Sequence, residues 1–228
     1  MGKDGATAVA LPFYGGYGAG MNLDHIKTLD ELRAAVEAFE GCSLKPFASK
    51  TVFSDGNPKA KIVLIGEAPG AQEDAVGKPF VGRSGQLLDK MLASIGLDRH
   101  SEGTNSVYIT NTVFWRPQDN RTPTPAETLS CRPFLMKHLE LLAPEIIVLV
   151  GGTAVKSVLQ TTDGIGKFRS RWLGFEVPGL GTVAMLATFH PAYLLRNPPA
   201  KKDAWEDLKM LRTKAEELGI ISREAMAA

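Results

Sequence analysis

The chain has 228 residues, enough for one domain with a sizeable core, and its 44% hydrophobic and 22% charged residues are typical of a globular protein. Its 26 basic and 25 acidic side chains leave a formal net charge of +1, which excludes a uniformly basic nucleic-acid binder but not a local basic face. Two cysteines, Cys42 and Cys131, are too few for a disulfide framework or, by themselves, for a four-ligand metal site, and no apolar run approaches the roughly 20 residues of a membrane-spanning helix.

The domain organisation follows from the composition along the chain. The N-terminal segment is rich in glycine and lacks the long apolar core of a secretory signal. No later break in composition divides the chain, and no internal repeat is visible. We expect a flexible extension over residues 1–24, a single domain over residues 25–220 and a short tail over residues 221–228. The two cysteines are expected to be free thiols in a reducing cytoplasm.

Helix and strand patterns begin after the extension. Thr28 and Glu31 have the spacing of a capping box, and apolar residues at helical spacing predict a helix that ends near Gly41. A short strand is expected at residues 51–53. The apolar run at residues 62–65 predicts the first firm strand of a sheet.

The next stretch carries a polar loop between this strand and an amphipathic helix. The loop, residues 66–85, is rich in glycine, proline and acidic side chains, and the helix is expected to begin near Ser84 and to stop at Gly96. This order places the loop at the carboxyl end of a strand, where open α/β sheets bind their ligands. We expect the functional site there.

Two more strands and their connections follow. Residues 107–110 are strand-like, with Asn111 at the carboxyl end, and the proline-rich segment after them must be a loop. Thr124 is expected to cap a helix that has Pro125 at its first position. The fully apolar run at residues 146–150 is typical of a central parallel strand.

The last part of the chain completes the fold. A short helix should follow Gly151, and residues 174–188 suggest a hairpin or strand pair that ends shortly before His190. We expect residues 190–199 to form a loop and residues 201–218 a final helix. Strands that alternate with helices predict an α/β fold, a three-layer α/β/α sandwich around a mostly parallel four-stranded sheet.

Polar and aromatic residues follow three of the predicted strands. Because the carboxyl ends of parallel strands lie at one edge of a sheet, Glu67, Phe80, Asn111 and His190 are expected to meet around one pocket. A carboxylate, an aromatic face, an amide and an imidazole suit the recognition and cleavage of a planar heterocycle.

Several segments together resemble a known family. The sequence GEAPGAQEDAVGKPFVGRSGQLL, residues 66–88, looks like the first motif of the uracil-DNA glycosylase superfamily, and most of all like its iron–sulfur class, often called family 4. The resemblance continues through YITN at residues 108–111, RPQDNRTPTP at residues 116–125 and HPAYLLR at residues 190–196. It spans roughly residues 42–211, and the motifs occur in the family's order.

The resemblance implies a role for each residue of the pocket. Phe80 would stack on an extruded uracil, and Asn111 would bind the edge that carries O4 and N3–H. His190 would donate to O2 of the departing base, and Glu67 would position or activate water. Glu73 would crowd the 5-methyl group of thymine. The other residues that the resemblance places beside uracil are Ala68 and Gln72.

The resemblance also implies contacts with DNA. Either Leu195 or Arg196 would enter the duplex and fill the space left by the flipped base. A local phosphate-binding rim would form despite the near-neutral total charge, and its members would be Arg83, Arg116, Arg121, Arg196, Lys201 and Lys202, with Ser84 as a further DNA contact.

The sequence departs from the iron–sulfur class at the cysteines. That class holds its cluster with four cysteines, of which Cys42 matches the second and Cys131 the fourth, while Phe39 and Trp115 take the other two places. Two thiolates cannot hold a cluster that requires four, so we predict a protein without cofactor or metal. A second departure, Ala71, stands where relatives often have an acidic or polar residue, which favours Glu67 as the carboxylate.

These observations predict a monofunctional DNA glycosylase that removes uracil from DNA and leaves an abasic site, as in base excision repair of damaged DNA. The enzyme would be a hydrolase that flips the base, releases free uracil and acts as a monomer in the cytoplasm. Two alternatives stay open: a catalytically weak protein that binds or traps uracil-containing DNA, and an α/β module that binds a nucleobase.

Overall fold

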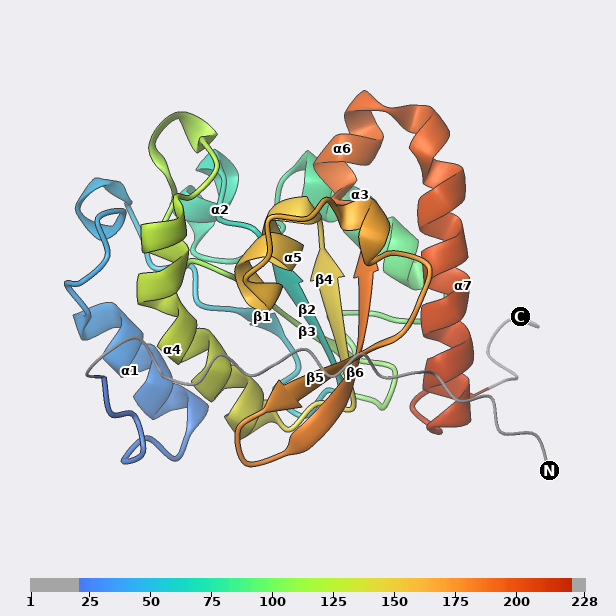
Figure 1. Ribbon diagram of the computed structural model, residues 1–228, viewed down its shortest axis with the longest axis horizontal. Coiled ribbons are helices and arrows are strands. Elements are labelled where there is room, and N and C mark those ends of the chain that lie inside the picture. Colours follow the sequence, from blue (N-terminus) through green and yellow to red (C-terminus); the bar gives the residue numbers. More distant parts are fainter. Residues whose placement is uncertain (1–20, 223–228) are drawn as a thin grey trace.

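A six-stranded sheet forms the centre of the protein in the computed structural model, which describes residues 21–222 (Figure 1). The strand order is β1-β3-β2-β4-β6-β5, with four parallel central strands and an antiparallel strand at each edge. Five-residue apolar runs build the middle of the sheet because both faces are covered and every side chain there is buried. The strands are β1 (Asp55–Gly56), β2 (Ile62–Gly66), β3 (Val107–Asn111), β4 (Ile146–Val150), β5 (Leu173–Val177) and β6 (Gly181–Thr188).

The predicted α/β class and the mostly parallel sheet are confirmed, but the predicted count of four strands is wrong. The extra strands are the two antiparallel edges. Strand β1 has only two residues and no apolar run, and it exists because Asp55 pairs with Ile109 of β3. The strand expected at residues 51–53 does not form, and β5 joins the sheet as one arm of a hairpin with β6.

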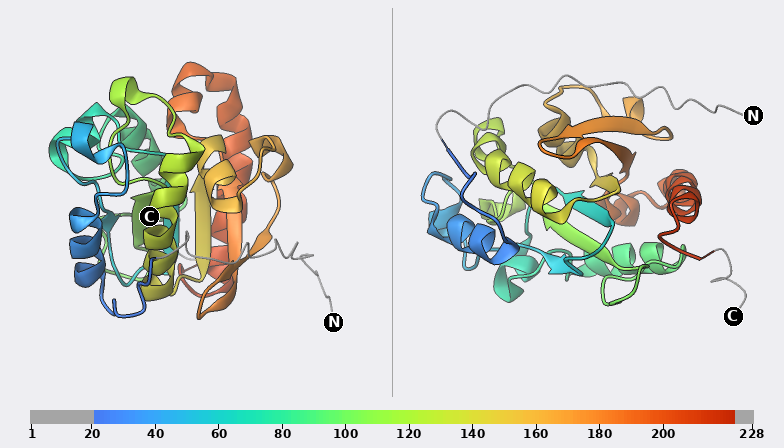
Figure 2. Two further views of the ribbon diagram at one scale, coloured as in Figure 1. Left: turned by 60° about the vertical axis from the view of Figure 1, so that its left-hand side comes forward. Right: turned by 90° about the horizontal axis from the view of Figure 1, so that it is seen from below.

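Helices cover both faces of the sheet, as the view from below shows (Figure 2). Helices α3 and α7 pack on one face, α4 and α5 pack on the other, and α1 packs against the outer side of α4. The helices are α1 (Leu29–Ala38), α2 (Ala71–Val76), α3 (Arg83–Ala93), α4 (Pro125–Leu142), α5 (Gly152–Leu159), α6 (Pro191–Arg196) and α7 (Lys201–Glu217). Single 3-10 turns occur at Lys45–Phe47, Gln118–Asn120, Ile165–Lys167 and Pro198–Ala200.

Local sequence signals explain where the long helices begin. Thr28 accepts a hydrogen bond from the backbone of Glu31, and Thr124 caps α4 in the same way, so both capping boxes are present. Two short helices, α2 and α6, occupy segments that were expected to be loops. Helix α6 begins directly after His190, because that side chain caps it and Pro191 suits its first position.

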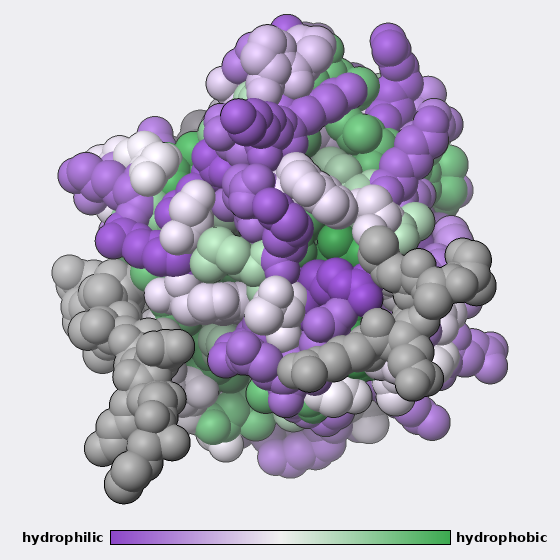
Figure 3. Space-filling model, turned by 90° about the vertical axis from the view of Figure 1, so that its right-hand side faces the viewer, coloured by the Kyte–Doolittle hydropathy of each residue, from purple (hydrophilic) through white to green (hydrophobic). Residues whose placement is uncertain are grey.

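The ends of the chain and its surface complete the description. Residues 1–20 of the predicted extension and residues 223–228 of the predicted tail lie outside the described residues. The face that carries α7 mixes hydrophilic and apolar side chains in small areas (Figure 3). Within residues 21–222, no helix is both long and apolar enough to cross a membrane.

The sheet places three loops at one edge. Strands β2, β3 and β4 run parallel, and Gly66 at the end of β2 is in register with Asn111 at the end of β3. The residues that follow β2 and β3, together with the start of α6 after β6, therefore surround the same space. This is the edge at which open α/β sheets bind ligands.

Candidate active site

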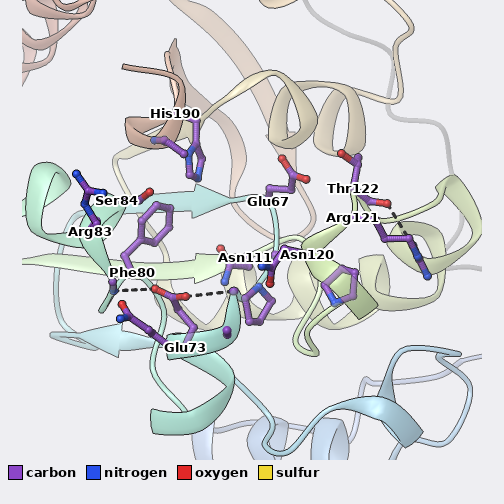
Figure 4. A pocket seen from close by; sticks show the side chains of 18 of the residues that line it. Glu67, Glu73, Phe80, Arg83, Ser84, Asn111, Asn120, Arg121, Thr122 and His190 are labelled. Atoms are coloured by element: carbon purple, nitrogen blue, oxygen red, sulfur yellow. Dashed lines mark hydrogen bonds between the residues drawn. The ribbon is translucent and has the colours of Figure 1, made fainter. Parts of the chain in front are cut away.

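A cavity of about 620 Å³ lies at the carboxyl edge of the sheet (Figure 4). Its walls come from the loop after β2, the end of β3, the proline-rich loop before α4 and the start of α6. Every predicted site residue except Arg116, Leu195, Lys201 and Lys202 lines it, namely Glu67, Ala68, Gln72, Glu73, Phe80, Arg83, Ser84, Asn111, Arg121, His190 and Arg196. The predicted pocket therefore exists, although residues up to 129 positions apart in the chain must meet to form it.

Asn111 contributes a buried amide to the cavity. Its side chain is 2% exposed, and its Oδ1 atom has no hydrogen-bond partner among the described residues. A buried polar atom without a partner is costly, which suggests that a ligand supplies the missing hydrogen. The opposing Gly66 makes this geometry possible, since a Cβ there would lie 2.4 Å from Asn111 Oδ1 and 2.6 Å from the Phe80 ring.

Phe80 presents its ring to the same space. The residue is buried and has a φ of 53°, a left-handed conformation that aromatic residues rarely adopt. Gly85 is required behind it, because a Cβ at that position would lie 1.7 Å from the Phe80 carbonyl oxygen. The ring centroid is 5.5 Å from that of His190, and the planes are tilted by 30°.

Glu73 is bonded to the backbone around Phe80. Its Oε1 atom accepts hydrogen bonds from the N–H groups of Val81 and Gly82, both at 2.9 Å, and its Oε2 accepts from Gly70 N–H at 3.1 Å. Three backbone donors thus hold a carboxylate that also lines the cavity (Figure 4). The sequence predicts only a steric role for Glu73. It does not predict that Glu73 holds the backbone, because the fold of the loop decides which N–H groups the carboxylate meets.

His190 stands at the start of α6 with a defined tautomer. Its Nδ1 accepts a hydrogen bond from the Ala192 backbone N–H at 3.1 Å, so in the neutral ring Nε2 carries the proton. Burial, and to a smaller extent the positive charge of Arg196, lowers the pKa of His190 to about 4, while Glu73 acts in the opposite direction. The imidazole is therefore neutral near pH 7 and offers one N–H donor.

Glu67 follows β2 directly. Its backbone carbonyl accepts a hydrogen bond from the Thr112 hydroxyl at 2.7 Å, which ties the loop to the end of β3. Its carboxylate lines the cavity, and Figure 4 shows it on the side away from Phe80. The cavity thus has an aromatic face on one side and a carboxylate on the other.

The arginines differ in what they can contact. Arg83, Arg121 and Arg196 all line the cavity. Of these, Arg121 is held by Glu127 through two hydrogen bonds of 2.8 and 2.6 Å. The hydrogen bond from Arg121 lowers the pKa of Glu127 to about 2, so the pair stays ionised and much of the Arg121 charge is compensated. Arg116 lies outside the lining and donates to Asn120 Oδ1 at 2.8 Å.

The structure adds lining residues for which the sequence predicts no role in the site. Their position within the quoted motifs was the only sequence signal that could have identified them as lining residues. They are Pro69, Gly70, Ala71, Gly82, Pro117, Asn120, Thr122 and Ala192. Leu195, for which the sequence does predict a role, lies outside the lining and is 38% exposed.

The two cysteines lie together, away from the cavity. Cys131 donates its S–H to Cys42 across 3.8 Å, which lowers the pKa of the Cys42 thiol to about 6. Phe39 packs beside them, and its ring centroid lies 6.4 Å from that of Trp115 and 5.0 Å from that of Phe134.

These residues do not fit the four-cysteine cluster of the iron–sulfur class. Two thiols in mutual contact supply half of the ligands, and aromatic rings pack around them. Within residues 21–222, no group of three or more His, Cys, Asp or Glu side chains is arranged to hold a metal ion.

Comparisons with known proteins agree with this geometry. The model of the uracil DNA glycosylase superfamily matches residues 53–209, a range that contains the whole cavity lining. The type-4 uracil-DNA glycosylase of Archaeoglobus fulgidus is 38% identical over 189 residues, which cover 82% of this chain and 92% of that protein. The enzyme of the same name from Thermotoga maritima is 40% identical over 162 residues, 71% of this chain and 80% of that protein. The one from Saccharolobus solfataricus is 37% identical over 189 residues, 81% and 85% of the two chains.

Proposed function

The chain belongs to the uracil DNA glycosylase superfamily, and from this premise we propose that it is a monofunctional uracil-DNA glycosylase. It hydrolyses the N-glycosidic bond of uracil in DNA and leaves an abasic site. The observation that carries the proposal is the buried Oδ1 of Asn111, which lacks a partner and lies beside the Phe80 ring. An aromatic face and an unpaired amide oxygen at its edge suit a flat base with an N–H group in its plane.

Asn111 distinguishes uracil from cytosine by its hydrogen-bond pattern. Uracil presents N3–H to the Oδ1 acceptor and O4 to the amide donors of the same side chain. Cytosine presents the reverse pattern, an unprotonated N3 and an amino group. Binding of cytosine would leave the buried amide unpaired, at a cost of about 1–3 kcal/mol for each unsatisfied group.

His190 stabilises the departing base. As the bond from N1 to the sugar breaks, the electron pair stays with uracil and negative charge grows on O2. The neutral imidazole donates its Nε2–H to that oxygen, while Nδ1 remains held by the Ala192 N–H. Removing one such donor typically costs about 10²–10³-fold in rate.

Water completes the reaction. Glu67 orients a water molecule toward the sugar carbon C1′, and its negative charge stabilises the cationic character that develops there. The water oxygen bonds to C1′, its proton leaves to the carboxylate or to solvent, and uracil departs as the N1 anion and is then protonated. The phosphates and the uracil anion also stabilise the cation, so loss of Glu67 slows turnover without abolishing it.

The DNA lies across the mouth of the cavity. Arg83 and Arg196 provide positive charge at the rim, and Ser84 stands with Arg83 in the first turn of α3, where backbone N–H groups favour phosphate. Exposed Leu195 and its neighbour Arg196, both on α6, are the two candidates for the residue that fills the gap left by the flipped base. The compensated charge of Arg121 makes it a weaker phosphate ligand than Arg83.

The enzyme acts without an iron–sulfur cluster and without another metal or nucleotide cofactor. The contact between Cys42 and Cys131 and the packing of Phe39 support this part of the proposal. We further propose that it acts as a monomer in the cytoplasm and releases free uracil.

A labelled oligonucleotide with one uracil tests the function. It is incubated with the protein and EDTA, as single and double strands, and then treated with alkali, which cleaves at abasic sites. Cleavage at uracil supports the enzyme, and strong loss of cleavage in Asn111→Asp and His190→Ala supports the assigned roles. DNA retained without cleavage would indicate a binding protein. If the protein neither cleaves nor retains the DNA, the nucleobase-binding module is the alternative that remains.

A further inference from the structure

Phe80 needs more support than its own packing provides. Its left-handed backbone conformation is unfavourable for an aromatic residue, so the surrounding structure must hold it. The segment between α2 and α3 that carries it has no regular secondary structure of its own, and Pro79 before it has no N–H to donate. Part of that support comes from a side chain that does not line the cavity.

Arg99 holds the residue before Phe80. Its side chain is 3% exposed, and its Nη1 donates to the Pro79 carbonyl oxygen at 3.0 Å. The same guanidinium donates from Nε to Asp89 Oδ1 of α3 at 2.6 Å, and Nη1 lies 3.5 Å from Asp55 Oδ2 of β1. Arg99 is not among the residues that line the cavity.

Glu73 holds the residues after Phe80. Its Oε1 accepts from the N–H groups of Val81 and Gly82. The backbone is thus bonded on both sides of Phe80, because Arg99 donates to the carbonyl before it and Glu73 accepts from the N–H groups after it. We call Arg99 and Glu73 the Phe80 clamp.

We propose that Arg99 is a positioning residue of the base site, which acts through the Phe80 clamp to hold the ring ready for stacking. This proposal rests on the proposed function. Burial of a charged pair is weak evidence for stability, and Arg99 keeps its Nη2 buried without a partner among the described residues. The fork geometry of its other donors, by contrast, matches one carbonyl and one carboxylate at once.

Removal of the guanidinium is expected to affect steps that need a stacked base. In Arg99→Met, kcat/KM for uracil release should fall about tenfold or more, because the ring is no longer fixed in its strained conformation. Affinity for DNA that carries an abasic analogue should change by less than about twofold, since no base is there to stack. The matched control is Arg132→Met, which removes a half-buried arginine that is likewise bonded to backbone carbonyls, those of Ser157 and Val158. It should change neither quantity by more than about twofold.

A milder variant guards against loss of folding. Arg99→Lys keeps a positive charge between Asp55 and Asp89, but one ammonium group cannot reproduce the fork. It should unfold at nearly the wild-type temperature and still lose several-fold in kcat/KM. Placed in a Phe80→Ala background, Arg99→Lys should add less than about twofold, because the ring that it positions is gone.

Hydrogen exchange separates the clamp from the proposed function. Amides in the peptide that covers residues 77–85 should exchange faster in Arg99→Lys than in wild type, and Arg132→Met should leave them unchanged. Losses that multiply in the double variant, or unchanged exchange, would overturn the positioning role. If exchange accelerates as expected but wild-type protein releases no uracil, the clamp holds the loop and the proposed function is what fails.

Discussion

Gly66→Ala is the most direct test of the geometry of the base site. Gly66 is the last residue of β2 and faces both Asn111 and Phe80. A Cβ there would lie 2.4 Å from Asn111 Oδ1 and 2.6 Å from the Phe80 ring, whereas ordinary contacts begin at 3.4 Å. The amide oxygen must therefore move by about 1 Å and the ring by nearly as much, unless the end of β2 shifts away from both.

The size of the effect follows from that displacement. A shift of about 1 Å in a group that positions the substrate costs on the order of 10²-fold in rate, equivalent to about 2.7 kcal/mol. Overpacking of the buried strand end should in addition lower the free energy of unfolding by about 1–3 kcal/mol. We therefore expect a folded protein whose kcat/KM for uracil release is about 10²-fold below wild type.

The assay is single-turnover release of uracil from a labelled oligonucleotide, together with thermal unfolding of each variant. Gly152→Ala serves as the control, because a Cβ there has only ordinary contacts, the nearest at 3.9 Å from Ile165 Cβ, and the residue lies outside the cavity lining. It should keep wild-type activity. If Gly66→Ala also kept activity within about twofold, Asn111 and Phe80 would not form the base site as described.

Other variants test the remaining parts of the site. Asn111→Asp should lose activity by orders of magnitude in the alkali assay, because an ionised side chain no longer donates to O4 and repels the uracil anion; near wild-type activity would remove Asn111 from the base site. Glu73→Ala should gain thymine release from a thymine-containing oligonucleotide if the side chain crowds the 5-methyl group, and should lose uracil release because Val81 and Gly82 lose their acceptor; a variant with unchanged rates on both substrates would speak against both roles. Burial lowers the pKa of His190 to about 4 from an ordinary 6.5, so the folded protein binds this proton less readily than the unfolded chain, and stability should decline as the pH falls from about 6.5 toward 4. In urea unfolding at pH 7 and pH 4.5, wild type should lose roughly 2–3 kcal/mol more than His190→Gln, and equal losses would contradict the buried neutral imidazole. Purified protein should contain no stoichiometric iron and show no visible iron–sulfur absorbance band. The presence of either would show that Cys42 and Cys131 take part in a cluster.

In the cysteine region, aromatic residues stand beside the two thiols. Phe39 and Trp115 stand where the resemblance places two ligands, and their rings lie in one hydrophobic cluster with both thiols and Phe134. This cluster joins the loop after α1 to α4. Apolar packing therefore links these segments, and the predicted absence of an iron–sulfur cluster is tested by the iron content.

Elements whose signals are local could be predicted from the sequence. Five-residue apolar runs predicted β2 and β4 because a buried parallel strand needs no polar face. The capping box at Thr28 and the cap at Thr124 with Pro125 after it predicted where α1 and α4 begin, since the residues involved lie within four positions of each other. Because the motifs follow strands of one sheet, their order also predicted that Asn111 and His190 would share a pocket, and both line it.

Only the tertiary structure decided how each side chain of the site is bonded. The two-residue strand β1 depends on its pairing with β3, which no local pattern encodes. Glu73 turns to the amides after Phe80, Arg121 is held by Glu127, and Arg99 reaches a carbonyl twenty residues earlier in the chain. Hydrogen bonds between distant segments depend on where the whole backbone places donors and acceptors, so motif spacing identified the residues of the cavity but not what holds them there.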